Sequence, residues 1–324
     1  MRARLLAGFK SYLALRSAGI LLGYAAQVFV SRWMGKQEYG YYSLLTTAAF
    51  VLGYVAALGF PTSMERFLPQ YIVDGRWGKF KGLIRYSTTR MLWASAAMAV
   101  PMGAVLAWYP HWSNLEKLAA VAAMILIPVQ SAQEIFEGGL TAEKRWMDSF
   151  VPSLVVAPVA FILGVVALDQ VIGQLHLMHV MVVLVVVNAL TTLLQGVLLI
   201  RSLPPEARGA TPDYSDRGPW VATSIPVLVM IMFGVLQARA DLFAVGYFLG
   251  HAHAGVYAAV LATTDVLGTF AKASSTVVTP EIAPLLHEGR IARLQWLISD
   301  AALLATRPTV VLAILLTFIG DDLL

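Results

Sequence analysis

The sequence lacks cysteine and is poor in charge. Without cysteine, disulfide bonds and thiolate metal sites are excluded. Asp, Glu, Lys and Arg make up 13% of the chain and hydrophobic residues 58%, whereas about a quarter of an average soluble domain is charged. The strict apolar–polar alternation of a transmembrane β-barrel is also missing. These absences leave an all-α integral membrane protein as the expected class.

The motifs of common enzymes are missing as well. The chain contains no phosphate-binding loop of the GxxxxGK[ST] type, no HExxH zinc motif and no GxSxG nucleophile motif. The connections expected on the outer side have six to eight residues, which leaves no room for an active site facing outward. We therefore expect a protein that is not an enzyme, with no cofactor and no metal ion.

The sequence contains long apolar runs. Residues 41–60 contain no charged side chain, and the mean hydropathy of the chain is +0.71. About 20 apolar residues cross the hydrocarbon core as a helix, because a helix satisfies its own backbone there. Nine such spans are predicted, at 12–33, 41–62, 87–108, 115–136, 149–168, 177–200, 219–243, 254–276 and 298–319. The first is expected to be a retained helix, since it is too long for the core of a signal peptide.

Lysine and arginine occur mainly in every second connection between these spans. The N-terminal arm and the basic connections carry Arg2, Arg4, Lys10, Arg66, Arg76, Lys79, Lys81, Arg85, Arg90, Lys144, Arg145, Arg201, Arg208, Arg217, Arg290 and Arg293. The alternate connections have only Arg32, Lys36 and Lys117 at their edges. Because cytoplasmic loops are enriched in lysine and arginine, we predict a cytoplasmic N-terminus. The same distribution explains the pI of about 9.3 without a nucleic-acid partner.

The most polar stretch divides the chain in two. Residues 201–219 read RSLPPEARGATPDYSDRGP, rich in proline, glycine and charge, which is typical of a linker. We therefore predict a six-helix bundle over 1–202, a cytoplasmic linker over 203–218, and three helices of a second bundle over 219–324.

A phrase near the start of each predicted bundle is repeated. VSRWMGKQEYGYYSLL, at 30–45, and VGYFLGHAHAGVYAAV, at 245–260, share a Gly-x4-Gly-x-Tyr pattern at an offset of 215. A second match, DGRWGKFKGL with EGRIARLQWL, follows the next span of each bundle. The alternative is that turns between membrane helices simply favour glycine. A duplication would relate the bundles by an axis along the membrane normal, with a cleft between them that opens to either side in turn.

These stretches, together with RFLPQYIVDGR and ADLFAVGYFLGHAHAGVYAAV, resemble the polysaccharide branch of the MOP superfamily. That branch comprises the Wzx-type flippases of lipid-linked oligosaccharides and is related to the MATE drug exporters. The resemblance implies a MATE-like fold of two helical bundles in a bacterial or archaeal cytoplasmic membrane. It also implies that the protein flips a polyprenyl-pyrophosphate glycan across that membrane by alternating access, for the biosynthesis of surface polysaccharides such as O-antigen and lipopolysaccharide.

The chain departs from that family in length. Family members resemble two six-helix halves, whereas this sequence ends with FIGDDLL, at the place equivalent to the end of the third span of the second half. The second bundle is thus expected to be incomplete. We expect a fragment rather than a truncated gene, because a half-open bundle would expose a cleft wall to lipid.

Charged side chains inside membrane spans identify candidates for the cleft, because each costs at least about 2.5 kcal/mol there. The substrate-binding candidates are Arg16, Arg66, Arg239, Asp241, Asp265 and Lys272. Together they predict a net-cationic cleft, in which arginine and lysine would neutralise a pyrophosphate. Asp241 and Asp265 are the candidates for binding a coupling proton or cation.

Structural roles compete with these assignments. Arg16 and Arg66 can extend to the inner interface, and Asp265 and Lys272 share one helical face, where both can bond to neighbouring helices. Arg239 lies only two residues from the next acidic candidate, so the two cannot face each other on a helix and need other partners.

Two further acidic residues, Glu134 and Glu137, are assigned to the inner boundary of the fourth span. Gln130, Gln133 and Glu134 are predicted to line its inner half.

Other functions remain open at this point. A cation-coupled drug exporter of MATE type would favour acidic and aromatic groups in the cleft, and a non-transporting subunit of an envelope-synthesis complex is a further alternative. The expected partners are the lipid-linked glycan and membrane lipid, with contacts to glycan-polymerase machinery left open. We expect the chain to be a monomer.

Overall fold

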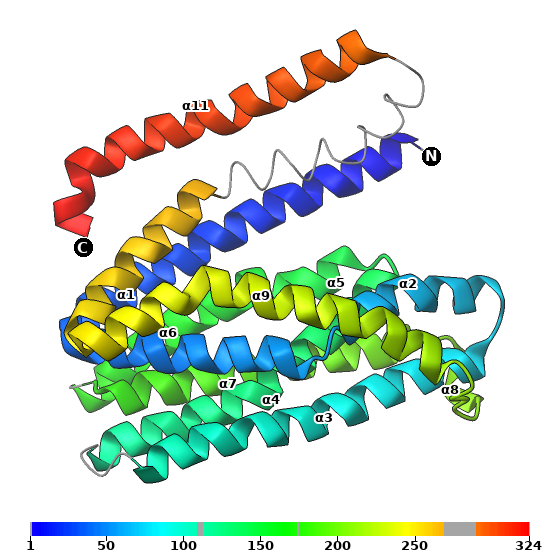
Figure 1. The fold of residues 1–324 in the computed structure, drawn as a ribbon, viewed down its shortest axis with the longest axis horizontal. Helices are drawn as coiled ribbons and strands as arrows, with labels where there is room; N and C mark the ends of the chain where they lie inside the picture. The colour runs from blue at the N-terminus through cyan, green and yellow to red at the C-terminus, as the bar shows by residue number, and fades with distance from the viewer. Residues whose placement is uncertain (1, 109–112, 174, 269–289, 324) are drawn as a thin grey trace.

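The computed structural model describes residues 2–108, 113–173, 175–268 and 290–323, which are helical with short breaks and contain no strand (Figure 1). The helices are α1 (Arg2–Ala56), α2 (Phe60–Val73), α3 (Trp77–Trp108), α4 (Asn114–Ala142), α5 (Trp146–Val151), the π-helical segment η1 (Pro152–Val156), α6 (Ala157–Ile172), α7 (Leu177–Ser202), α8 (Pro205–Gly209), α9 (Arg217–Leu249), a helix over 251–268, and α11 (Ile291–Leu323). The predicted all-α class is confirmed.

The predicted spans coincide with helical residues wherever the chain is described, apart from a break at residues 57–59 inside the span 41–62. Within that part, four helices are long and apolar enough to cross a membrane: Asn114–Ala142, Trp146–Ile172, Leu177–Ser202 and Arg217–Leu249. The bent pair Ala18–Ala56 and Phe60–Val73, which meet at 41°, provides a fifth if counted as one span.

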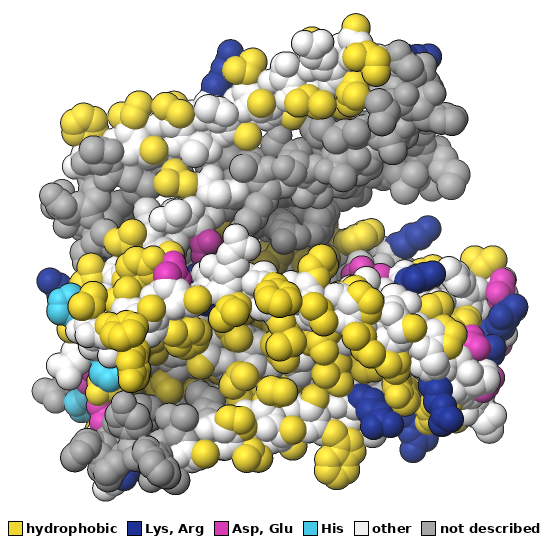
Figure 2. All heavy atoms as spheres, viewed as in Figure 1, with side chains coloured by type: hydrophobic (Ala, Val, Ile, Leu, Met, Phe, Trp, Pro, Cys, Tyr) yellow, Lys and Arg dark blue, Asp and Glu magenta, His cyan; other side chains and the backbone are white. Residues whose placement is uncertain are grey.

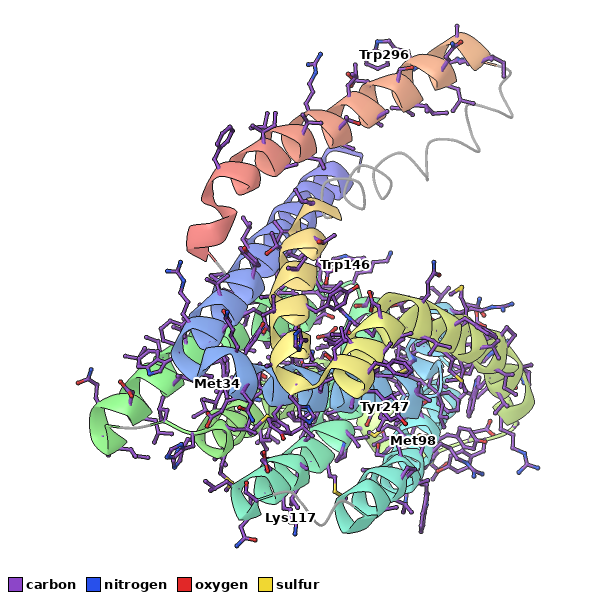
Figure 3. All side chains as sticks on the ribbon, turned by 60° about the vertical axis from the view of Figure 1, so that its left-hand side comes forward. Met34, Met98, Lys117, Trp146, Tyr247 and Trp296 are labelled. Atoms are coloured by element: carbon purple, nitrogen blue, oxygen red, sulfur yellow. The ribbon has the colours of Figure 1, made fainter. Side chains whose placement is uncertain are left out.

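The repeated phrase forms the same turn twice. Gly35, inside α1, has φ 73° and ψ 168°, and Gly250, which ends α9, has φ 88° and ψ 172°. Only glycine adopts this region without strain, because a Cβ atom would collide with the backbone. Figure 3 shows Met34 beside the sharp bend of α1. The offset of 215 seen in the sequence therefore relates two similar backbone conformations.

The two copies of the phrase also touch each other, backbone to backbone. A Cβ atom on Gly40 would collide with the carbonyl oxygen of His251, and one on Gly255 would collide with the carbonyl oxygen of Lys36. Lys36 and His251 are themselves related by the offset of 215. The contact is thus reciprocal, as at a local two-fold axis. We call it the glycine crossing.

The core centres on α4, which contacts α1, α2, α3 and α7. Its residues Ala119, Ala123, Leu126 and Ile127 are fully buried, and the alanines let neighbouring helices approach closely. Apolar side chains such as Leu163 and Phe233 are instead exposed on the outside, where they cover much of the surface in Figure 2. An apolar outer surface of this extent suits contact with lipid rather than water.

Basic residues gather at one end of the bundle, where α2 and α8 lie (Figures 1 and 2). This basic end contains the turns at 74–76 and 143–145 and the segment 203–216. The opposite end, called the glycine end, contains the turns at Gly35, Gly173 and Gly250, all with positive φ. Among the described residues, the basic connections at 74–76, 143–145 and 203–216 thus lie together (Figure 1), as the alternation of lysine and arginine requires.

Which end faces the cytoplasm can be tested by labelling, and the absence of native cysteine makes single-cysteine variants unambiguous. We expect a cysteine at Ala252, at the glycine end, to react with a membrane-impermeant maleimide added to intact cells. A cysteine at Ala210, at the basic end, should react only after the membrane is opened. The reverse pattern would contradict the orientation predicted from lysine and arginine.

Candidate functional site

A cavity of about 930 Å³ lies between the two predicted bundles. The first contributes both arms of α1 on either side of Gly35, the polar face of α4, and residues of α5, η1 and α7. The second contributes α9 and the helix over 251–268. This volume is within the range of small-molecule sites in proteins.

The α4 wall of the cavity carries four polar side chains. Gln130, Gln133, Glu134 and Glu137 follow the spacing i, i+3, i+4, i+7, which places them on one helical face. The Gln130 amide donates to Glu134 Oε1 at 3.1 Å, and the Gln133 amide donates to Glu137 Oε1 at 3.0 Å. Each carboxylate is therefore held by an amide one turn earlier on the same helix.

A second amide fixes this wall from α7. Gln195 is fully buried, and its Nε2 donates to Glu137 Oε1 at 3.1 Å and to the carbonyl oxygen of Ser149 at 2.6 Å. Ser149 lies in α5, which leads directly into the π-helical segment η1. Ser153 and Leu154 of η1 line the cavity. Single π-helical turns inside α-helices often occur at functional sites. The acidic wall is thus positioned by three helices rather than by α4 alone.

The opposite wall holds an ion pair between helices. Arg239 Nη2, on α9, lies 3.0 Å from Asp265 Oδ2 on the helix over 251–268, and both residues line the cavity. The Tyr24 hydroxyl, on α1, lies 3.1 Å from the Thr263 hydroxyl and so joins α1 to the same helix over 251–268. Polar contacts therefore connect the two bundles as well as the helices within each.

Asp241 lies outside this lining. Its carboxylate accepts a hydrogen bond from the Tyr257 hydroxyl at 2.7 Å and one from the backbone N–H of Leu242 at 2.8 Å. As helix geometry requires, it does not bond to Arg239, two residues away. Among the residues predicted to bind substrate, the structure brings Arg239 and Asp265 together at the cavity and places Asp241 elsewhere.

The remaining candidates are not part of the described cavity lining. Arg66 is exposed at the basic end, where its Nη1 donates to Thr223 Oγ1 at 3.3 Å and its guanidinium lies 5.2 Å from the Phe67 ring centre. The side chain of Arg16 and the whole of Lys272 lie outside the described residues.

Two expectations from the sequence concern the lining of this cavity. Glu134 and Glu137, which were assigned to the inner boundary of the fourth span, line the cavity together with Gln130 and Gln133. The signal that could have found them is their shared stripe with the two glutamines. The cleft was also predicted to be net cationic, and two of the cationic candidates, Arg16 and Lys272, have side chains outside the described residues. The charged residues in the described lining are three carboxylates and one guanidinium. Over the described residues, the lining is therefore acidic.

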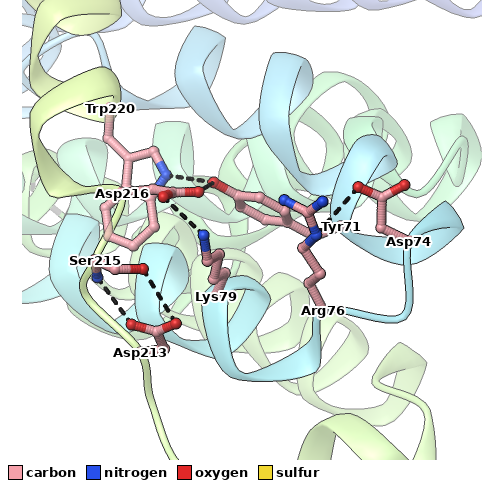
Figure 4. Close-up of polar contacts among 8 residues, drawn as sticks. All are labelled: Tyr71, Asp74, Arg76, Lys79, Asp213, Ser215, Asp216 and Trp220. Atoms are coloured by element: carbon pink, nitrogen blue, oxygen red, sulfur yellow. Dashed lines mark hydrogen bonds and ion pairs between the residues drawn. The ribbon is translucent and has the colours of Figure 1, made fainter.

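At the basic end, a buried tryptophan ties α9 to α2 and α3 (Figure 4). Trp220 is fully buried, and its Nε1 donates to the Tyr71 hydroxyl at 2.9 Å. That hydroxyl donates to Asp216 Oδ2 at 2.8 Å, and Lys79 Nζ donates to Asp216 Oδ1 at 2.8 Å. We call these four residues the basic-end clamp.

Close backbone approaches surround the clamp. The Ser63 and Ser224 hydroxyls lie 2.8 Å apart, and a Cβ on Gly59 would come 2.5 Å from the Ser224 carbonyl oxygen. The Asp213 N–H donates to the Gly78 carbonyl at 2.9 Å. The segment predicted as a linker is therefore docked on α3 along part of its length.

The hydrogen bond from Lys79 lowers the pKa of Asp216 from its usual value of 3.8, and the Tyr71 hydroxyl adds to this effect. A lowered folded-state pKa means that the carboxylate stabilises the fold at pH values above its unfolded pKa. That stabilisation is lost as the pH falls through the folded value.

We therefore expect Asp216→Asn to melt at a lower temperature than the wild type at pH 7. The difference should shrink below pH 4. Tryptophan fluorescence of the purified protein in detergent measures the melting temperatures at pH 7 and below pH 4. Glu206→Gln, which removes an exposed carboxylate from the same end, should melt like the wild type, and an equal loss in both variants would contradict a specific clamp.

Comparison with known proteins identifies the fold. No known protein family and no curated protein sequence matches the chain. Among solved structures, an inward-facing multidrug resistance MATE family transporter of the MOP superfamily matches with a TM-score of 0.62 at 12% identity, over 93% of this chain and 69% of that one. The MATE multidrug transporter DinF-BH matches with a TM-score of 0.60 at 13% identity, over 96% of this chain and 72% of that one. The chain therefore has the fold of MATE transporters.

Proposed function

We propose that the protein is a cation-coupled membrane transporter that works by alternating access and carries a cationic, amphipathic substrate. The observation that carries this proposal is the acidic cavity between the two bundles, with Glu134, Glu137 and Asp265 against one guanidinium. The likeness to MATE multidrug transporters supports a transport role for this fold.

The charge of the lining favours a cation. Arg239 is already paired with Asp265, so its charge is offset locally. The groups that hold Glu134 and Glu137 in the contacts described above are neutral amides, which donate hydrogen bonds without cancelling negative charge. A carboxylate in a membrane span is costly unless it is protonated or bound to a cation. The two glutamates are thus the best candidates for the coupling proton or cation and for the positive group of a substrate.

The two bundles meet at contacts of different kinds. The glycine crossing joins backbone to backbone at the glycine end. At the basic end, the side-chain hydrogen bonds of the clamp lie beside the close approach of Gly59 to the Ser224 carbonyl oxygen. Side-chain bonds can break and re-form without changing a helix axis. We therefore assign the crossing as the pivot and the clamp as the gate whose opening would expose the cavity at the basic end.

A lipid-linked oligosaccharide flippase is the second candidate. Arg239 in the cavity could meet a phosphate, and the amide and hydroxyl groups of Gln27, Gln130, Ser43 and Asn188 in the lining suit sugars. The sequence resemblance to Wzx-type flippases also supports this reading. An anionic substrate would, however, have to compete with Asp265 for the guanidinium.

Reconstituted proteoliposomes test the two functions side by side. We expect tetraphenylphosphonium to move across the membrane when a proton or sodium gradient is applied, at rates well above protein-free vesicles. A fluorescent polyprenyl-pyrophosphate oligosaccharide should stay in its leaflet. Flipping of that lipid without movement of the cation would instead establish the flippase. Movement of neither would contradict both and favour a non-transporting subunit.

A further inference from the structure

One face of α3 changes from cationic to apolar along its length. The helix packs against α4, α2 and α1, and its outer face is exposed at Arg85, Arg90, Trp93 and Val100. Trp93 is 73% exposed and Val100 is 68% exposed, although both are large apolar residues. Trp93 and Val100 are seven residues apart and share one helical face, and Arg85 and Arg90, which are five residues apart, flank that face on its two sides.

The cationic end of this face has no acidic partner in the described part of the chain. Neither Arg85 nor Arg90 makes an ion pair there, whereas Arg76, Lys79 and Arg145 at the same end all do. The Arg90 guanidinium lies 5.2 Å from the centre of the Tyr86 ring, which restricts its position and leaves its N–H groups available. The two guanidinium groups can therefore accept an anion.

The dimensions of the face match one leaflet of a membrane. From Arg85 to Val100 the helix rises about 22 Å, at about 1.5 Å per residue. Half of a bilayer with its headgroups measures about 20–22 Å. Trp93 stands between the charged and apolar parts, as tryptophan does at membrane interfaces.

We propose that this face of α3 binds an anionic phospholipid of the leaflet at the basic end. The phosphate lies between Arg85 and Arg90, and an acyl chain follows Leu92, Trp93 and Val100. Two guanidinium groups match a phosphate by charge and by fork geometry, and the apolar stripe selects a lipid over a free phosphate ion. This inference does not depend on which substrate the cavity carries.

The lipid would also lie next to the basic-end clamp. The Tyr86 ring beneath Arg90 is 5.9 Å from the Trp220 ring and 5.7 Å from the Phe60 ring, between ring centres. An occupied phosphate site would hold Arg90, and through it Tyr86, against the buried tryptophan of the clamp. Bound lipid should therefore stabilise the clamp in its closed arrangement.

Native mass spectrometry of the purified protein tests the site with two lipids, phosphatidylglycerol and phosphatidylcholine. We expect the wild type to retain phosphatidylglycerol preferentially, and the double variant Arg85→Gln/Arg90→Gln to bind it about tenfold or more weakly, since each basic group near a membrane surface contributes about 1 kcal/mol. The matched control Lys144→Gln/Arg201→Gln removes two exposed charges from the same end and should bind as the wild type does.

Thermal unfolding gives a second measurement. Phosphatidylglycerol should raise the melting temperature of the wild type and of the control, but not that of Arg85→Gln/Arg90→Gln. Equal losses in both double variants would show that only net charge matters and would overturn the site. Displacement of phosphatidylglycerol by millimolar inorganic phosphate would show an ion site rather than a lipid site. A wild type without lipid preference would overturn the proposal as well.

Discussion

Replacing Gly40 with valine should prevent most of the protein from folding, because the new side chain would occupy the place of the His251 backbone carbonyl. Overpacking that only displaces side chains costs about 1–3 kcal/mol, and here a backbone must move. We expect the free energy of unfolding to fall by about 3 kcal/mol or more, which is typical of severe changes in a protein core. Size-exclusion chromatography in detergent measures this loss as a decrease in the amount of monodisperse protein.

The reciprocal position supplies the test of symmetry. Gly255→Val should have a similar effect, because a Cβ there collides with the Lys36 carbonyl. The two substitutions act at one crossing, so the double variant should lose less than the sum of the two losses. Gly23→Ala is the control, since a Cβ at Gly23 meets no atom within 4 Å. If Gly40→Val accumulated and melted as this control does, the close crossing would be disproved.

The crossing also shows what a sequence can reveal about this fold. Long apolar runs predicted the helices because about 20 apolar residues are needed to cross the hydrocarbon core, and a helix satisfies its own backbone hydrogen bonds there. The repeated glycine pattern marked positions where only glycine is tolerated, and Gly35 and Gly250 adopt similar positive-φ conformations. Local chemistry determines both features, so both are visible in the amino-acid sequence alone.

The contacts that build the site depend instead on pairings between distant residues. Trp220 and Tyr71 bond across 149 positions of the chain, and Arg239 and Asp265 bond across 26. No local pattern specifies these partners, which explains why the docked linker and the ion pair were not predicted. The α4 stripe differs, because its helical spacing is visible in the sequence. Gln130, Gln133 and Glu134 were predicted to line the inner half of the fourth span, whereas Glu137 was judged only by its distance from the end of that span.

The acidic stripe carries the prediction with the largest effect on transport. Glu134→Gln/Glu137→Gln keeps the size and most of the hydrogen-bonding capacity of both side chains while removing two carboxyl groups that can release a proton or bind a cation. A hydrogen bond or contact to a charged group contributes about 1.5–3 kcal/mol, so the loss of one such contact to a cation should slow transport about 10- to 100-fold. Gradient-driven uptake of tetraphenylphosphonium into proteoliposomes measures the rate, and circular dichroism confirms that the variant is folded.

A second variant makes the result decisive between the two candidate functions. Arg239→Gln removes the only guanidinium among the described lining residues and releases Asp265 from its ion pair. If the cargo is a cation, this variant should keep at least wild-type transport of tetraphenylphosphonium, because the cavity becomes more negative, while Glu134→Gln/Glu137→Gln loses it. If the cargo is a lipid pyrophosphate, the order reverses: flipping of the fluorescent lipid should fail in Arg239→Gln and persist in the glutamate variant. A glutamate variant that transports the cation at the wild-type rate would contradict the role assigned to the acidic wall of the cavity.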